Sequence, residues 1–201
     1  MKGVMLGRCL LAFAISCAPA FCGIATLITF DDLGTEVYGN TPIQNGYAGL
    51  NWNNFYYVTP GIEFQSSGYY AGMVSAPNVG FNGYRHPASF SSSTPFTLDS
   101  AYLMSAFKSN LWVRVTGYNS DGVPIDTERV MLHDNGSTFV QFDWSDLSSV
   151  RFSAHEQYFG IDNLMLDMNP TPEPAFTWVG LGILACLAGF NWRRFSMRKA
   201  E

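Results

Sequence analysis

The chain has 201 residues, a length that suits one domain of ordinary size once terminal segments are set aside. Charged residues make up 13% and aromatic residues 15%, a mixture typical of a β-rich extracellular domain rather than a helical cytosolic one. Between Phe21 and Pro172, five basic residues stand against fourteen acidic ones, a net charge of −9 that disfavours nucleic acid as a partner.

The first twenty residues predict a signal peptide. Lys2 and Arg8 form a short basic region, and the uncharged run 9–17 that follows is too short to cross a bilayer core of ~30 Å. Ala18-Pro19-Ala20 then supplies the small residues that a signal peptidase recognises. We expect cleavage after Ala20, with cleavage after Ala25 as the alternative, and export of everything that follows.

Residues 21–169 predict one all-β domain, a jelly-roll-like β-sandwich. Apolar and polar side chains alternate in short segments separated by Gly, Asn and Pro, and no helical period is present. In residues 111–118, "LWVRVTGY", the alternation places Leu111, Val113 and Val115 on one face and Trp112, Arg114 and Thr116 on the other. Asp134-Asn135-Gly136 predicts a hairpin turn between two strands.

Three aspartates are the candidate metal ligands. Asp31 and Asp32 follow the first expected strand, and Asp162 opens the last. The first and last strands of a jelly roll commonly lie side by side, and Ca²⁺ prefers carboxylate oxygens, so these residues predict a structural Ca²⁺ as the one candidate cofactor. The alternative is that all three are solvated turn residues.

Eight aromatic residues are candidates for a sugar-binding surface. Aromatic faces stack on the C–H faces of sugar rings, while neighbouring amides and carboxylates meet the hydroxyls. The alternative is that the rings belong to the core, with each tyrosine pair placing one ring inside and one outside. The residues are Trp52, Phe55, Tyr56, Tyr57, Tyr69, Tyr70, Tyr84 and Trp112.

The sequence contains few features of an enzyme active site or of a transition-metal site. The span from Gly23 to Trp178 contains no cysteine, which excludes a disulfide framework and a thiolate metal site there. The three histidines are far apart and lack zinc-ligand spacing; they are His86, His133 and His155. GxSxG and HExxH motifs are absent, and no carboxylate pair is singled out, so we predict no catalytic residues and no enzyme activity.

The C-terminal residues 170–201 predict a processing signal. Pro172-Glu173-Pro174 precedes the uncharged run 175–192, whose eighteen residues extend ~27 Å as a transmembrane helix. Arg193 and Arg194 follow it, and the positive-inside rule keeps them cytoplasmic. The expected order is an exported domain, a short membrane anchor and a basic stub; a plain tail anchor is the alternative.

This order of Pro-Glu-Pro motif, apolar span and terminal basic cluster resembles the PEP-CTERM sorting signal. The central stretches "TFDDL", "NGYAGLNWNNFYYV", "NVGFNGY" and "DNL" are similar to the globular part of many PEP-CTERM proteins. The resemblance implies a Gram-negative host, recognition by a membrane-embedded exosortase and cleavage near the Pro-Glu-Pro motif. It also implies a link to exopolysaccharide or biofilm matrix. The family has no settled biochemical activity that the resemblance could assign to this chain.

Two functions remain open at the level of the sequence. The first is a structural protein of the cell surface or extracellular matrix, anchored transiently in the inner membrane before an exosortase sorts it. The second is a carbohydrate-binding module that attaches exopolysaccharide to the cell surface. Signal peptidase, exosortase and membrane are the expected processing partners in both.

Overall fold

The computed structural model describes residues 24–168. The expected signal peptide (1–20) and sorting signal (170–201), with its apolar run 175–192, lie outside these residues. Within 24–168, no helix is long and apolar enough to cross a membrane.

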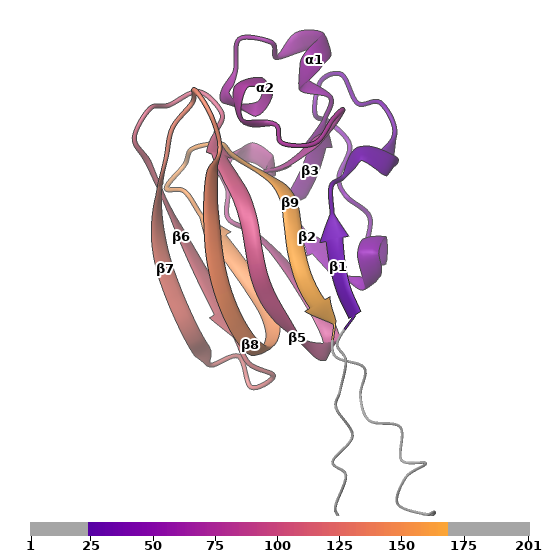
Figure 1. Ribbon diagram of the computed structural model, residues 1–201, viewed down its shortest axis with the longest axis vertical. Helices are drawn as coiled ribbons and strands as arrows, with labels where there is room; N and C mark the ends of the chain where they lie inside the picture. Colours follow the sequence, from indigo (N-terminus) through magenta and orange to yellow (C-terminus); the bar gives the residue numbers. More distant parts are fainter. Residues whose placement is uncertain (1–23, 169–201) are drawn as a thin grey trace, which may run out of the picture.

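Antiparallel β-strands form the body of the described domain (Figure 1). The strands are β1 (Ile24–Ile28), β2 (Asn51–Asn53), β3 (Phe55–Val58), β4 (Val79–Asn82), β5 (Ala88–Ser105), β6 (Leu111–Tyr118), β7 (Pro124–Leu132), β8 (Thr138–Ser153) and β9 (Phe159–Met168). The helices are α1 (Pro60–Glu63) and α2 (Gly68–Gly72), with 3-10 turns η1 (Asp31–Leu33), η2 (Tyr47–Gly49) and η3 (Gly83–Arg85).

The strands form two layers because β5 and β8 are long enough to take part in both. The first part of β5 and the last part of β8 lie in one layer, in the order β2-β5-β8-β6-β7. Their other halves pair with each other and with β9, which also pairs with β1 and β4, and β3 pairs with β4. The β5–β8 register breaks between Ser91 and Phe96, and such irregularities let a strand bend from one sheet into the other. The expected all-β sandwich is confirmed.

The core lies between the two layers and contains the apolar side of each strand. In β6, Leu111, Val113 and Val115 are buried, as the alternation predicted. At the centre, the ring of Phe55 lies 5.9 Å from that of Phe152 and 6.3 Å from that of Phe159, both in edge-on contact. Burying a side chain of this size contributes about 2–3 kcal/mol each to folding, so these rings fix the spacing between the layers.

The predicted hairpin at Asp134-Asn135-Gly136 is wrong. The tripeptide joins β7 to β8, but β7 pairs with β6, and β8 starts in the other layer, with Thr138 opposite Leu103 of β5. An Asn-Gly sequence favours a local chain reversal. It does not determine which strand pairs with the following one. The start of β8 pairs with β5 because its apolar side chains are buried there in the second layer.

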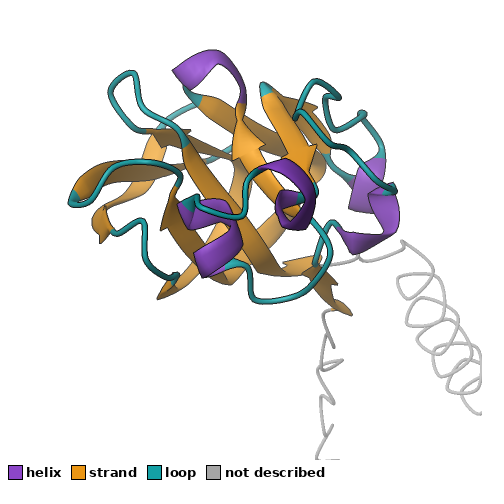
Figure 2. Cartoon of the chain, turned by 90° about the horizontal axis from the view of Figure 1, so that it is seen from above, coloured by secondary structure: helices purple, strands orange, loops and turns teal. Residues whose placement is uncertain are grey.

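The first and last strands lie side by side, as the jelly-roll expectation required. Ile24 pairs with Met168 and Ile28 with Leu164, so the described chain begins and ends at the same end of the sandwich (Figure 1). The helices α1 and α2 and their loops cover the opposite end (Figures 1 and 2). The two ends of the described chain therefore lie away from the end that α1 and α2 cover.

Candidate ligand-binding groove

A groove of about 690 Å³ lies on the outer face of the layer that contains β6. Because Leu111, Val113 and Val115 face the core, the side chains between them on β6 must face outward. These outward residues join others from β7, β8 and the loops 106–110 and 154–157. The lining consists of Lys108, Asn110, Leu111, Trp112, Arg114, Thr116, Tyr118, Arg129, Arg151, Ser153, Ala154, His155 and Gln157.

The strand register brings three arginines of the groove together. Arg114 of β6 stands directly opposite Arg129 of β7, and on its other side opposite Ser153 of β8. Arg151 lies two residues from Ser153 on the same face of β8, opposite Thr116. Directly opposed residues on one face have Cβ atoms roughly 5 Å apart and diagonal neighbours about 7–8 Å apart, so the three guanidinium groups share one patch.

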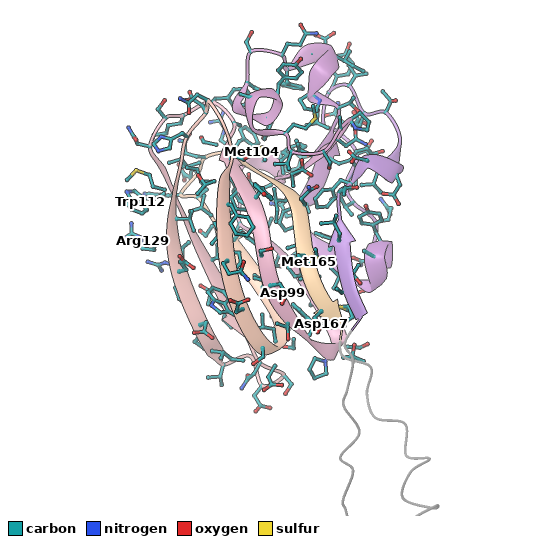
Figure 3. The ribbon with its side chains drawn as sticks, viewed as in Figure 1. Asp99, Met104, Trp112, Arg129, Met165 and Asp167 are labelled. Atoms are coloured by element: carbon teal, nitrogen blue, oxygen red, sulfur yellow. The ribbon has the colours of Figure 1, made fainter. Side chains whose placement is uncertain are left out.

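Trp112 gives the groove an exposed aromatic surface. Its side chain is 46% exposed, although it belongs to a strand whose other face is completely buried. The guanidinium carbon of Arg129 lies 5.2 Å from the centre of the Trp112 ring, a cation–π contact that orients both side chains (Figure 3). The groove therefore combines an aromatic ring with several hydrogen-bond donors.

The outer face of the opposite layer carries the contrary charge. Asp99 of β5 and Asp167 of β9 lie on this face (Figure 3), near Asp143 of β8. Burial raises the pKa of Asp99 above its usual value, and the negative charges of Asp167 and Asp143 raise it further. The sandwich thus has one broad face that gathers cations and one that gathers carboxylates.

A second, smaller hollow lies at the end of the sandwich covered by α2. It has a volume of about 200 Å³ and an aromatic lining without a charged residue. Its rings mainly contact one another: Tyr69 lies 5.4 Å from Phe81 and 5.7 Å from Phe107, and Tyr158 lies 6.3 Å from Phe81. Burial raises the pKa of Tyr69 well above its usual value. We read this cluster as the packing that holds β3, β4 and α2 together.

The eight aromatic candidates from the sequence lie in different parts of the domain. Trp52, Phe55 and Tyr57 are core residues. The paired tyrosines follow the in-and-out expectation, since Tyr69 is buried and Tyr70 exposed. Tyr56, Tyr69 and Tyr84 line the small hollow, and Trp112 alone lines the groove.

The three predicted calcium ligands each have separate protein partners. Asp31 accepts a hydrogen bond from the backbone N–H of Asn78, and Asp32 accepts one from the hydroxyl of Tyr47. Asp162 is fully buried and accepts hydrogen bonds from the backbone N–H groups of Val74 and Ser75. No group of three or more His, Cys, Asp or Glu side chains that could hold a metal occurs within residues 24–168. The alternative of solvated turn residues does not describe Asp162, because its side chain is buried.

Comparisons with known proteins place the fold. No protein-family model and no curated protein matches the sequence. The chain is similar in structure to a DUF4465 family protein from Bacteroides caccae, at 13% identity and a TM-score of 0.51, over 73% of this chain and 100% of that one. This likeness supports the sandwich fold and nothing about function.

Two further solved structures are similar to the chain at TM-scores below 0.5. One is the CBM22-1 xylan-binding domain of Paenibacillus barcinonensis Xyn10C (TM-score 0.41, 11% identity, 76% of this chain and 99% of that one). The other is TmCBM61 in complex with β-1,4-galactotriose (TM-score 0.35, 7% identity, 67% of this chain and 100% of that one).

Proposed function

We propose that this protein is an exported polysaccharide-binding protein of the cell surface or extracellular matrix, and that it binds its polysaccharide in the groove of β6, β7 and β8. The observation that carries the proposal is Trp112, a large ring exposed on a β-sheet face among side chains that donate hydrogen bonds. Aromatic rings of this kind stack on sugar rings while the polar neighbours meet the hydroxyls.

The lining of the groove favours binding over hydrolysis. Most glycoside hydrolases cleave with two carboxyl groups that flank the scissile bond. The groove lining contains neither aspartate nor glutamate. We therefore propose a non-enzymatic role, in which the protein retains polysaccharide rather than degrading it.

The export and sorting part of the proposal rests on the two terminal segments of the sequence. We propose removal of residues 1–20, a transient anchor at residues 175–192 and processing by an exosortase at Pro172-Glu173-Pro174. The arrangement of the described domain is compatible with this route, since its two ends leave from one end of the sandwich while the groove lies on a broad face.

Trp112→Ala should weaken polysaccharide binding by about tenfold or more, because a stacked indole in a binding site contributes at least 1–2 kcal/mol. The measurement is titration calorimetry of the exported protein against a panel of polysaccharides. Phe139→Ala is the matched control, since Phe139 is 51% exposed but lies on β8 in the opposite layer. Equal affinities for unmutated protein and Trp112→Ala would remove the groove from consideration.

Loss of the host exosortase should leave a larger form of the protein in the membrane. The reason is that the run 175–192 would then remain attached and keep its apolar residues in the bilayer. Mass spectrometry of membrane and extracellular fractions measures this, and substitution of Pro172, Glu173 and Pro174 by alanine should reproduce it. Identical mass and location with and without the enzyme would leave only a plain tail anchor.

A further inference from the structure

The groove gathers nearly all the cationic side chains of the described domain. Residues 24–168 contain five lysine and arginine side chains against fourteen carboxylates. Four of the five line the groove, and no carboxylate does; they are Lys108, Arg114, Arg129 and Arg151. If the charged residues of so acidic a domain were scattered at random, a surface of this size would carry both positive and negative side chains.

The arrangement is unfavourable for the domain by itself. Arg114 and Arg129 are directly opposed on neighbouring strands, a position in which like charges destabilise a sheet. The contacts found within residues 24–168 include no ion pair or hydrogen bond from the guanidinium groups of Arg114 and Arg151. Arg129 has the Trp112 ring, which leaves its positive charge unneutralised.

We propose that the groove recognises an acidic polysaccharide, one that carries carboxylate or sulfate groups on rings that stack against Trp112. This inference rests on the proposed function and names its ligand class. A guanidinium is a planar donor that forms two parallel hydrogen bonds with a carboxylate or a sulfate-like oxyanion. Three such groups in one patch, with Lys108 at its end, match a polymer that repeats its negative charge from ring to ring.

Nucleic acid fits the same patch less well. Double-stranded DNA carries one negative charge per ~1.7 Å, and domains that bind it are usually basic overall, with a pI above about 9. This chain has a pI of about 5.1, and the face opposite the groove gathers Asp99, Asp143 and Asp167. A polysaccharide with one charge per ring meets the cationic groove with less repulsion from the rest of the domain.

The experiment compares matched pairs of polysaccharides that differ only in charge. The protein, purified as the cell exports it, is titrated with polygalacturonate and its carboxyl-reduced form, with dextran sulfate and dextran, and with duplex DNA. We expect the acidic member of at least one pair to bind at least tenfold more tightly than its neutral counterpart, with an affinity that falls as salt rises. The pair that shows the difference identifies carboxylate or sulfate as the recognised group.

The variants test whether the arginines carry the effect. Arg114→Gln, Arg129→Gln and Arg151→Gln should each weaken acidic binding by about tenfold, the loss expected of one charge-assisted hydrogen bond. Arg85→Gln is the matched control, because Arg85 is the one cation of residues 24–168 outside the groove lining. Arg114→Gln and Arg151→Gln should also melt at the same temperature as the unmutated protein or higher, since each removes repulsion within the patch.

Each outcome distinguishes the inference from the proposed function. Equal binding of charged and neutral members, lost in Trp112→Ala, would overturn the acidic ligand and leave polysaccharide binding intact. Duplex DNA bound as tightly as the acidic polysaccharide would overturn the ligand class. An absence of binding to every polysaccharide in the panel would overturn both.

Discussion

Gly68→Ala should abolish stable folding or lower the free energy of unfolding by more than about 4 kcal/mol, the range that diagnoses a forced clash in a packed region. A Cβ atom at Gly68 would overlap the backbone carbonyl oxygen of Ser105 and lie 2.8 Å from the Cα of Asp134. Neither is the end of a flexible side chain, so neither can rotate away. The backbone N–H of Gly68 also donates a hydrogen bond to the carbonyl of Ala106, at 2.7 Å, which ties α2 to the end of β5.

Thermal unfolding measures the effect, and a fall in melting temperature of at least about 10 °C is expected for a domain of this size. Gly61→Ala is the matched control, since Gly61 lies in the other short helix, α1. A Cβ there would meet only the ring of Tyr70, at an ordinary 3.8 Å. Alanine is favoured over glycine in a helix, so this control should be neutral or slightly stabilising. A similar melting temperature for both variants would contradict the packing of α2 against β5.

The region around Gly68 also shows what sequence patterns could not predict. The helices α1 and α2 have four and five residues, and a period of 3.6 cannot be recognised in segments of about one turn. The position of α2 depends instead on its contact with β5, which is distant in the chain, and α1 packs against α2. Burial of Tyr69 and Phe81 against each other selects this arrangement, and those contacts have no local signature.

The strand faces, by contrast, were predictable because side-chain alternation is local. The alternation in residues 111–118 placed Leu111, Val113 and Val115 inward, and the structure confirms this arrangement. It likewise placed Trp112 and Arg114 outward. The groove itself was not predicted, since it exists only because β6 lies between β7 and β8. A search for outward basic residues on separate strands would have pointed to Arg114 and Arg151, but not to their proximity.

The calcium site stays a prediction, although the backbone arrangement on which it was argued is present. The pairing of β1 with β9 is confirmed, and it was the premise from which a shared site for Asp31, Asp32 and Asp162 was argued. Strand pairing fixes neighbours along the backbone but not the side of the sheet to which each carboxylate points. Asp162 is directed to the loop after α2, where Val74 and Ser75 supply donors, while Asp31 reaches Asn78.

Asp162→Ala should therefore destabilise the domain by about 2–4 kcal/mol, because it leaves buried donors without an acceptor. The carboxylate accepts from the N–H groups of Val74 at 2.7 Å, Ser75 at 2.9 Å and Asn163 at 2.8 Å, and from the Ser75 hydroxyl at 3.2 Å. Asp121→Ala is the matched control, since Asp121 is exposed in the turn that follows β6. Its removal should change the melting temperature little.

The pH dependence of the domain's stability provides a second test of the contribution of Asp162. Burial raises its pKa above the usual value, and the hydrogen bonds from Ser75, Val74 and Asn163 oppose this shift without cancelling it. Because the folded-state pKa lies above the unfolded one, the contribution of this group to stability is fully present below the unfolded pKa and is lost as the pH rises through the folded pKa. The melting temperature of the unmutated domain should therefore fall as the pH rises through the folded-state pKa of Asp162. The side chain in Asp162→Asn does not titrate, so the melting temperature of this variant should not show that fall.

Unfolding in excess calcium and in excess chelator decides between the two roles of Asp162. If the carboxylate serves only as a hydrogen-bond acceptor, Asp162→Ala lowers the melting temperature equally in both solutions, and the curves of the unmutated domain coincide. A shared calcium would instead stabilise the unmutated domain by RT ln(1 + [L]/Kd), ~2.7 kcal/mol at a hundredfold excess over Kd, and Asp162→Ala would abolish that difference. The separate hydrogen-bond partners of Asp31, Asp32 and Asp162 lead us to expect coincident curves. A calcium-dependent shift that disappears in Asp162→Ala would instead support the calcium site predicted from the sequence.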